Sequence, residues 1–177
     1  MTINVRNNQV IRFLVLAVGL YLIWLLTYHL VINPYTTWDF HLNDNVAYLA
    51  QLGFQLMGKS TDIVYESDHV VLYLNEGSFR GIWIGDACNG FKLFPIFTIF
   101  ILAFPGPARS KLWFIPLGLL IIHLANVIRV ISLLLINNYY PKYLDFNHLY
   151  TFTVFVYGII FLCWYIWAKR FAHVKKD

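Results

Sequence analysis

The sequence contains little cysteine and little charge. Only two of its 177 residues are cysteines, Cys88 and Cys163, and charged residues make up 12% of the chain. Two cysteines are too few for a disulfide-rich scaffold. So little charge together with 59% hydrophobic residues excludes an ordinary soluble or disordered chain. The composition therefore predicts a polytopic membrane protein.

Several signatures of catalysis and nucleic-acid binding are also missing. The chain has no phosphate-binding glycine loop, no serine nucleophile elbow and no paired carboxylates. Its histidines are scattered, with no pair at metal-ligand spacing on one membrane face, so we expect no metal and no cofactor. The basic residues lie beside hydrophobic segments, where they report membrane topology, and no nucleic-acid partner is expected.

Four hydrophobic segments are candidates for crossing a bilayer, namely residues 11–32, 91–104, 112–136 and 149–168. A spanning helix needs about 20 apolar residues, so the second segment is short. Its predicted span is therefore extended back to 88–104, which leaves Pro95 near the first turn, where proline is tolerated. We expect a single all-α membrane domain over residues 1–177 with four transmembrane helices.

Basic residues gather at one end of these spans. Eight of the 13 basic residues flank that end, against a single acid, Asp177; they are Arg6, Arg12, Arg109, Lys111, Lys169, Arg170, Lys175 and Lys176. The positive-inside rule then places both termini in the cytoplasm and the loops 33–87 and 137–148 outside. No small-residue cleavage site follows the first segment, so it is interpreted as a retained anchor in a bacterial cytoplasmic (inner) membrane.

The predicted outer loop has internal structure. Residues 39–58 have the spacing of an amphipathic helix that lies on the membrane surface or caps the bundle. The stretches "HVVLYL" and "FRGIWI", joined by the turn-like "NEGS", predict a β-hairpin that leads directly to Asp86 and Cys88. The hairpin could pair with a peptide substrate through its edge, or form a lid that packs on itself, and the sequence leaves both open.

Three reactive side chains are expected at the same depth near the outer face. Cys88 opens the second span, His148 opens the fourth, and Arg129 lies about 25 Å along the third, counted from residue 112. A thiolate, an imidazole and a guanidinium form a set suited to acyl transfer. Arg129 and His148 also have simpler interpretations, because an arginine can extend to the lipid headgroups and an interfacial histidine can be a polar cap.

The surroundings of Cys88 predict a lowered thiol pKa, because positive charge and a helix N-terminus both favour a thiolate. Cys163 lies about 21 Å farther toward the cytoplasm, which excludes a disulfide and predicts a packing residue. Asn126 is on the same helical face as Arg129 and could hold its guanidinium or a substrate carbonyl. His123 either supports the arginine or is a hydrogen-bonded core histidine.

The segments "DACNGF", "NVIRV" and "NHLYTFTVFVYG" resemble motifs of the exosortase/archaeosortase family of membrane-embedded cysteine transpeptidases. The resemblance covers roughly residue 86 to the end. It implies Cys88 as the nucleophile and Arg129 and His148 as its catalytic partners. Supporting or substrate-binding candidates within or near these motifs are Asn126, Asn89, Gly90 and Asn147. Asn89 stands where many members have serine, and four spans are fewer than in larger members, which indicates a compact bacterial branch.

The resemblance implies that the protein cleaves the C-terminal sorting signals of secreted proteins and transfers them to a surface acceptor. Such a signal has a short motif, one transmembrane helix and a basic tail. The remaining expected partner is membrane lipid, and the acceptor is unknown. A protease that releases the acyl group to water is an alternative. A non-catalytic scaffold or assembly protein for surface polysaccharide export, in which Arg129 and His148 bind a polar partner, is an alternative of another class.

Overall fold

A computed structural model describes residues 9–66, 69–77, 80–85 and 88–171. The helices are α1 (Gln9–Thr27), α2 (Asn33–Tyr35), α3 (Trp38–Leu56), α4 (Leu93–Ala103), α5 (Ala108–Tyr139), α6 (Leu144–Phe146) and α7 (Phe152–Arg170). Two π-helical turns (Tyr28–Ile32 and Asn147–Thr151) and one 3-10 turn (Pro141–Tyr143) join them. The strands are β1 (Thr61–Glu66), β2 (His69–Leu74) and β3 (Gly81–Ile84). The predicted topology residues Arg6, Lys175, Lys176 and Asp177, and the motif residue Asp86, lie outside the described residues.

Within the part of the chain that the structure describes, three helical segments are long and apolar enough to cross a membrane: Gln9–Tyr35, Ala108–Tyr139 and Pro141–Arg170. The chain is therefore a helical membrane protein. The predicted count of four spans is not confirmed, because α4 has 11 residues. At the α-helical rise it covers only about 16 Å, against a hydrocarbon core of about 30 Å.

The structure corrects the predicted start of the second span at residue 88. Before α4 the chain turns: the Phe91 N–H donates to Asn89 Oδ1 over 2.8 Å, and Gly90 has a φ of +78°. Glycine adopts this left-handed conformation without the penalty that a Cβ brings. Helical bonding begins only with the Leu93 N–H, which donates to the Gly90 carbonyl over 2.9 Å. Cys88 therefore lies in a turn ahead of the helix, whereas Pro95 does lie in the first turn of α4.

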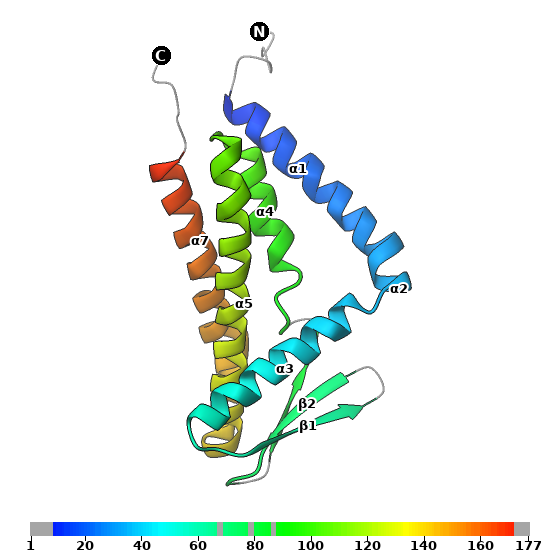
Figure 1. Cartoon of the computed structure of the whole chain (residues 1–177), viewed down its shortest axis with the longest axis vertical. Coiled ribbons are helices and arrows are strands. Elements are labelled where there is room, and N and C mark those ends of the chain that lie inside the picture. Colours follow the sequence, from blue (N-terminus) through cyan, green and yellow to red (C-terminus); the bar gives the residue numbers. More distant parts are fainter. Residues whose placement is uncertain (1–8, 67–68, 78–79, 86–87, 172–177) are drawn as a thin grey trace.

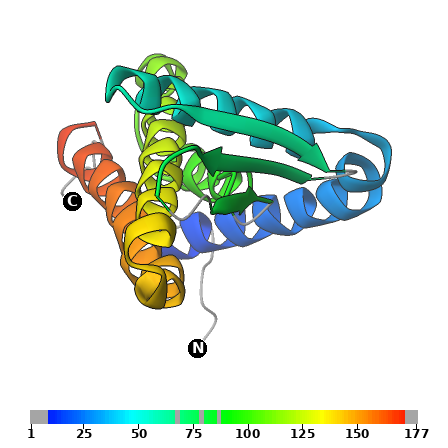
Figure 2. The same cartoon turned by 90° about the horizontal axis from the view of Figure 1, so that it is seen from below.

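The helices α4, α5 and α7 form a bundle, and α1 slants away from it (Figure 1). The start of α1 and the end of α7 lie at one end of the molecule, called here the terminal end, and the strands lie at the opposite, sheet end. In Figure 2, which looks along the bundle from the sheet end, α1 and α7 diverge on the two sides of α4. No residue of α1 is buried, and it touches α4 through Phe13, which packs against Phe100 and Phe104.

A first hydrophobic core joins α4, the first half of α5, and α7. Phe97, Ile160 and Trp167 are fully buried in it, and Gly118 on α5 gives room for the Phe97 ring. Cys163 packs in this core and Cys88 in the other one, and both are free thiols. The predicted packing role of Cys163 agrees with this position.

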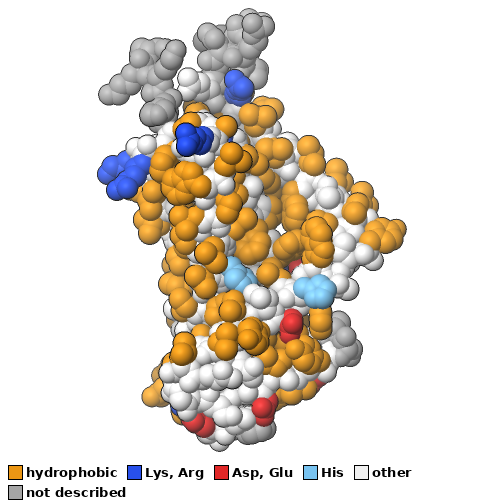
Figure 3. All heavy atoms as spheres, in the orientation of Figure 1, with side chains coloured by type: hydrophobic (Ala, Val, Ile, Leu, Met, Phe, Trp, Pro, Cys, Tyr) orange, Lys and Arg blue, Asp and Glu red, His pale blue; other side chains and the backbone are white. Residues whose placement is uncertain are grey.

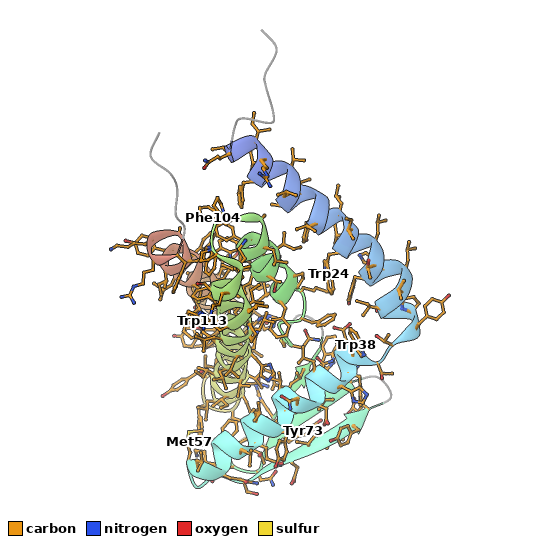
Figure 4. All side chains as sticks on the ribbon, turned by 45° about the horizontal axis from the view of Figure 1, so that its top comes forward. Trp24, Trp38, Met57, Tyr73, Phe104 and Trp113 are labelled. Atoms are coloured by element: carbon orange, nitrogen blue, oxygen red, sulfur yellow. The ribbon has the colours of Figure 1, made fainter. Side chains whose placement is uncertain are left out.

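A second core lies at the sheet end. The amphipathic helix predicted over 39–58 is observed as α3, which buries Val46, Ala50 and Phe54 against the sheet and α5. With its 32 residues, α5 is long enough to serve both cores. Its length of about 48 Å exceeds the hydrocarbon thickness by more than a third. Trp38 and Met57, labelled in Figure 4, mark the two ends of α3.

The predicted hairpin is present as β2 and β3, with Val70 opposite Ile84 and Leu72 opposite Ile82. The sheet has three antiparallel strands in the order β1-β2-β3, and β1 was not predicted. In β1 the acids Asp62 and Glu66 interrupt the apolar residues, so the strand pattern is weak. The hairpin packs on α3 and α5, and Asn137 on α5 donates to the Gly81 carbonyl of β3 over 2.9 Å. The contact fixes the start of β3 against α5. Cys88 follows the end of β3 by four residues.

Candidate active site

A cysteine and a histidine from distant parts of the chain meet between the two cores. The Cys88 Sγ lies 3.6 Å from His148 Nε2, within hydrogen-bonding distance for sulfur. Cys88 is 5% exposed. His148 belongs to the π-helical turn Asn147–Thr151 that precedes α7. Such turns widen a helix locally and are frequent at functional sites.

Arg129 on α5 completes the cluster. Its side chain is 7% exposed, and its charge acts on the Cys88 thiol and on the His148 ring. Arg129 and His148 line one cavity of about 330 Å³, which lies between the start of α4 and α7. The convergence of three residues that are 41 and 19 positions apart in sequence is therefore observed as geometry, although their chemical roles remain predictions.

The pKa of the Cys88 thiol differs from the sequence-based expectation. Burial raises the pKa of Cys88, while the Arg129 charge and a hydrogen bond with the Gly85 backbone lower it, and the net direction is upward. The expected lowering is wrong for two reasons: α4 begins five residues after Cys88, and the thiol packs within the second core. A raised pKa favours the protonated thiol, and the titratable group in contact with that thiol is His148 Nε2, 3.6 Å away.

Asn126 and Gly90 pack against each other close to Cys88. Asn126 is fully buried, and its amide donates to the Ile122 carbonyl over 3.1 Å. A Cβ at Gly90 would overlap the Asn126 amide, so the close approach requires glycine as much as the positive φ does. Gly90 lines the cavity, whereas Asn126 is not among the cavity-lining residues. Asn126 thus shapes the turn after Cys88.

The other predicted polar residues make contacts with the protein itself. Asn89 is fully buried and donates to Asp39 on α3 over 3.0 Å. Asn147 donates to the Tyr143 carbonyl over 2.8 Å and so supports the turn that carries His148. His123 bonds to Asn45 Oδ1 on α3 over 2.8 Å, which agrees with the predicted hydrogen-bonded histidine, but the residue is half-buried and so is not in the core.

Some lining residues were missed in the sequence. Lys92, Thr153 and Tyr157 line the cavity. Thr153 and Tyr157 lie four residues apart on one face of α7, after the histidine turn, so helical spacing could have found these two. Lys92 directly follows the cysteine motif, and its adjacency to that motif was the available signal. Asp39 is 49 positions before Cys88, and no spacing rule connects them. Among the described residues, no group of three or more histidines, cysteines or acids could hold a metal ion.

The fold and the cluster define a helical membrane protein with a cysteine, a histidine and an arginine assembled between its bundle and its sheet. The sequence model of one family, described as "Transmembrane exosortase (Exosortase_EpsH)", matches residues 5–168. The chain therefore belongs to the transmembrane exosortase family. No curated protein and no solved structure matches it.

Proposed function

We propose that this protein is a membrane cysteine transpeptidase that cleaves C-terminal sorting signals of secreted proteins and passes the new C-terminus to a surface acceptor. The observation that carries the proposal is the 3.6 Å contact of Cys88 Sγ with His148 Nε2, because His148 in turn lines a cavity together with Arg129. Membership of the exosortase family supports the same reaction class.

The reaction follows from the three side chains. His148 takes the thiol proton as Cys88 Sγ attacks the scissile carbonyl, and Arg129 stabilises the resulting oxyanion. When the C–N bond breaks, the imidazolium gives that proton to the leaving amine, and a thioester remains on Cys88. The acceptor nucleophile then attacks the thioester and loses its proton to His148. Its bond to the acyl group replaces the C–S bond, and the imidazolium returns the proton to the thiolate.

The distribution of charge supports an active site on the outer side of the cytoplasmic membrane. In Figure 3, Lys and Arg side chains gather at the terminal end, whereas Asp and Glu side chains lie toward the sheet end. Basic residues favour the cytoplasmic side. With the terminal end in the cytoplasm, the sheet, Cys88 and His148 face outward, where secreted proteins emerge.

A groove in the membrane-spanning part suits a substrate with one transmembrane helix. A second, apolar cavity of about 410 Å³ lies between α1, α4 and α7, nearer to the terminal end than the catalytic cavity. The two cavities use the same faces of the bundle helices. On α4, Leu93 lines the first cavity and Ile96 and Phe100 the second, at helical spacing. On α7, Tyr157 lines the first and Trp164, two turns later, the second. A substrate helix in this groove would present the peptide bond at its outer end to Cys88.

Photo-cross-linking at two leucines of α1 tests this groove. Leu22 lines the apolar cavity, and Leu26, one turn later, does not, although the two are similarly exposed, 54% and 62%. A benzophenone amino acid at position 22 is expected to cross-link a tagged secreted protein that ends in a motif, one helix and a basic tail. The same probe at position 26 should give at least about five times less product. Equal yields at the two positions would place the substrate helix elsewhere.

The C-terminus of the product distinguishes transfer from hydrolysis. We expect mass spectrometry of the processed substrate to find a new covalent group on the C-terminal carboxyl, because a thioester reacts faster with an amine than with water. Processing should be measured in membranes that contain the enzyme and the tagged substrate. A free carboxylate as the sole product would identify the protein as a protease. An unprocessed substrate, with several candidate signals tried, would contradict the proposal.

A further inference from the structure

The carboxylate of Asp39 joins three separate segments of the chain. Its Oδ1 accepts a hydrogen bond from Asn89 Nδ2 over 3.0 Å, and its Oδ2 accepts one from the Tyr28 hydroxyl over 3.1 Å. Asp39 lies in the first turn of α3, Tyr28 in the π-helical turn after α1, and Asn89 in the turn that carries the nucleophile. The Asp39 side chain thus connects the start of α3 to the turn after α1 and to the turn that contains Asn89.

The bond to Asn89 is directional and partly buried. The Oδ1 atom of Asn89 is already occupied by the Phe91 N–H, so the amide is held with its Nδ2 toward Asp39. Asn89 and Tyr28 are 0% and 5% exposed, whereas Asp39 is half-buried, so the carboxylate is the acceptor that the structure provides for these two buried donors. Loss of the carboxylate would leave a buried donor without an acceptor, and the turn would shift to find one.

Asn89 is covalently adjacent to Cys88, so a shift of its turn moves the thiol. The Cys88 N–H donates to the Gly85 carbonyl over 2.8 Å, and Gly90 is pressed against Asn126. Asp39 holds Asn89, the residue between Cys88 and Gly90. A thiol that must stay 3.6 Å from an imidazole tolerates little displacement, because misplacing a reacting group by about 1 Å can cost about 100-fold in rate.

We propose that Asp39 is a positioning residue that, through Asn89, keeps the Cys88 thiol against His148. This inference rests on the proposed role of Cys88 as the nucleophile. The hydrogen bond of Asp39 goes to Asn89, the neighbour of Cys88, so Asp39 acts through the turn. An acid in the first turn of a helix also stabilises that helix by itself, and the test must separate the two effects.

The test compares three variants with the wild-type protein in detergent or proteoliposomes. Asp39→Ala removes both hydrogen bonds, whereas Asp39→Asn can keep them by accepting from Asn89 and donating to the Tyr28 oxygen. Asp44→Ala is the matched control, because Asp44 is also on α3 and accepts a tyrosine hydroxyl bond, from Tyr65 over 2.7 Å. We expect Asp39→Ala to lower kcat by about 10- to 100-fold with KM within about threefold. Asp39→Asn should recover to within about threefold, and Asp44→Ala should stay within about twofold.

A double-mutant cycle with Asn89→Ser tests the route of the effect. Serine can still accept from the Phe91 N–H but cannot reach Asp39, so Asp39→Ala should lower kcat less than about threefold further in that background. Full additivity, or a loss of turnover that follows only the thermal unfolding temperature, would overturn the proposal.

Alkylation of Cys88, followed by mass spectrometry, needs no substrate. The rate of Cys88 alkylation in Asp39→Ala should differ several-fold from the wild-type rate. In Asp44→Ala it should equal the wild-type rate. Equal rates in all variants would refute positioning even if Cys88 proved to be the nucleophile. If wild-type turnover did not depend on Cys88, the proposed function would fail and a changed alkylation rate would still show that Asp39 places the thiol.

Discussion

Replacing Cys88 with alanine is expected to abolish processing of a membrane-anchored sorting signal. In the proposed mechanism the thiol supplies the bond-forming electron pair, and the nucleophilic group in contact with His148 Nε2 is Cys88 Sγ. Loss of the whole covalent route should lower turnover by at least about 10⁴-fold. Cells that carry Cys88→Ala should accumulate the uncut precursor, measured as the full-length tagged substrate in a membrane fraction. The fold should survive, because the change removes one sulfur atom from the second core.

Cys163→Ala is the matched control for this change. It also removes a buried free thiol, but from the core between α4, α5 and α7. Processing should remain within about twofold of the wild-type rate, with a modest loss of stability from the small cavity. A non-catalytic scaffold for polysaccharide export would behave differently, since Cys88→Ala would leave its function intact. Normal cleavage by Cys88→Ala would therefore remove the enzymatic interpretation.

The long spans could be predicted because lipid imposes a simple rule. The predicted segments 11–32, 112–136 and 149–168 lie within α1 to α2, α5, and the helices ending at α7. A bilayer demands continuous apolar residues, so hydropathy alone finds these helices. Hydropathy predicts the ends of these helices less accurately where the helix packs against protein and not against lipid. Helix α5 continues to Tyr139 because its last turns pack on α3 and the sheet.

The start of α4 could not be predicted from hydropathy. The residues from Phe91 onward are apolar, but the chain before Leu93 is held in a turn by contacts with Asp39 and Asn126. Both partners are distant in sequence, and neither leaves a local pattern. A single asparagine followed by glycine was the available signal, because this pair favours turns over helix.

The site was predictable in its composition but not in its electrostatics. Counting the helical rise placed Cys88, Arg129 and His148 at one depth, and the structure brings the three side chains together. The net pKa of the Cys88 thiol depends on how completely the turn is buried by α3, α5 and the sheet. Burial is a property of the packed core, so a sequence-based argument could recognise the charges that lower the pKa but not the packing that raises it.

Replacing Arg129 with glutamine is expected to lower turnover by about 10²- to 10³-fold, the usual loss when an oxyanion donor is removed. The guanidinium has two roles in the proposed mechanism: it stabilises the oxyanion and it favours the thiolate of Cys88. If Arg129 merely extended to lipid headgroups, the change would leave turnover and thiol reactivity unaltered. Steady-state turnover of a tagged substrate in proteoliposomes measures the first role.

The pH dependence of alkylation measures the second role of Arg129. The arginine charge lowers the pKa of Cys88 against the opposing effect of burial, so Arg129→Gln raises that pKa further. The thiolate forms as the pH rises through the pKa. The alkylation profile of Arg129→Gln should therefore move to higher pH, and its rate at neutral pH should fall. Iodoacetamide labelling of Cys88, quantified by mass spectrometry over a series of pH values, gives the profile.

Two further variants separate charge from geometry. Arg129→Lys keeps the positive charge but lacks the planar fork of the guanidinium, so its alkylation profile should stay close to wild type while turnover falls. Lys92→Gln removes another cation that lines the same cavity but does not shift the pKa of Cys88. Its alkylation profile should be unchanged. A shift as large in Lys92→Gln as in Arg129→Gln would mean that Cys88 responds to the general positive potential of the cavity, and the specific pairing of this thiol with Arg129 would be wrong.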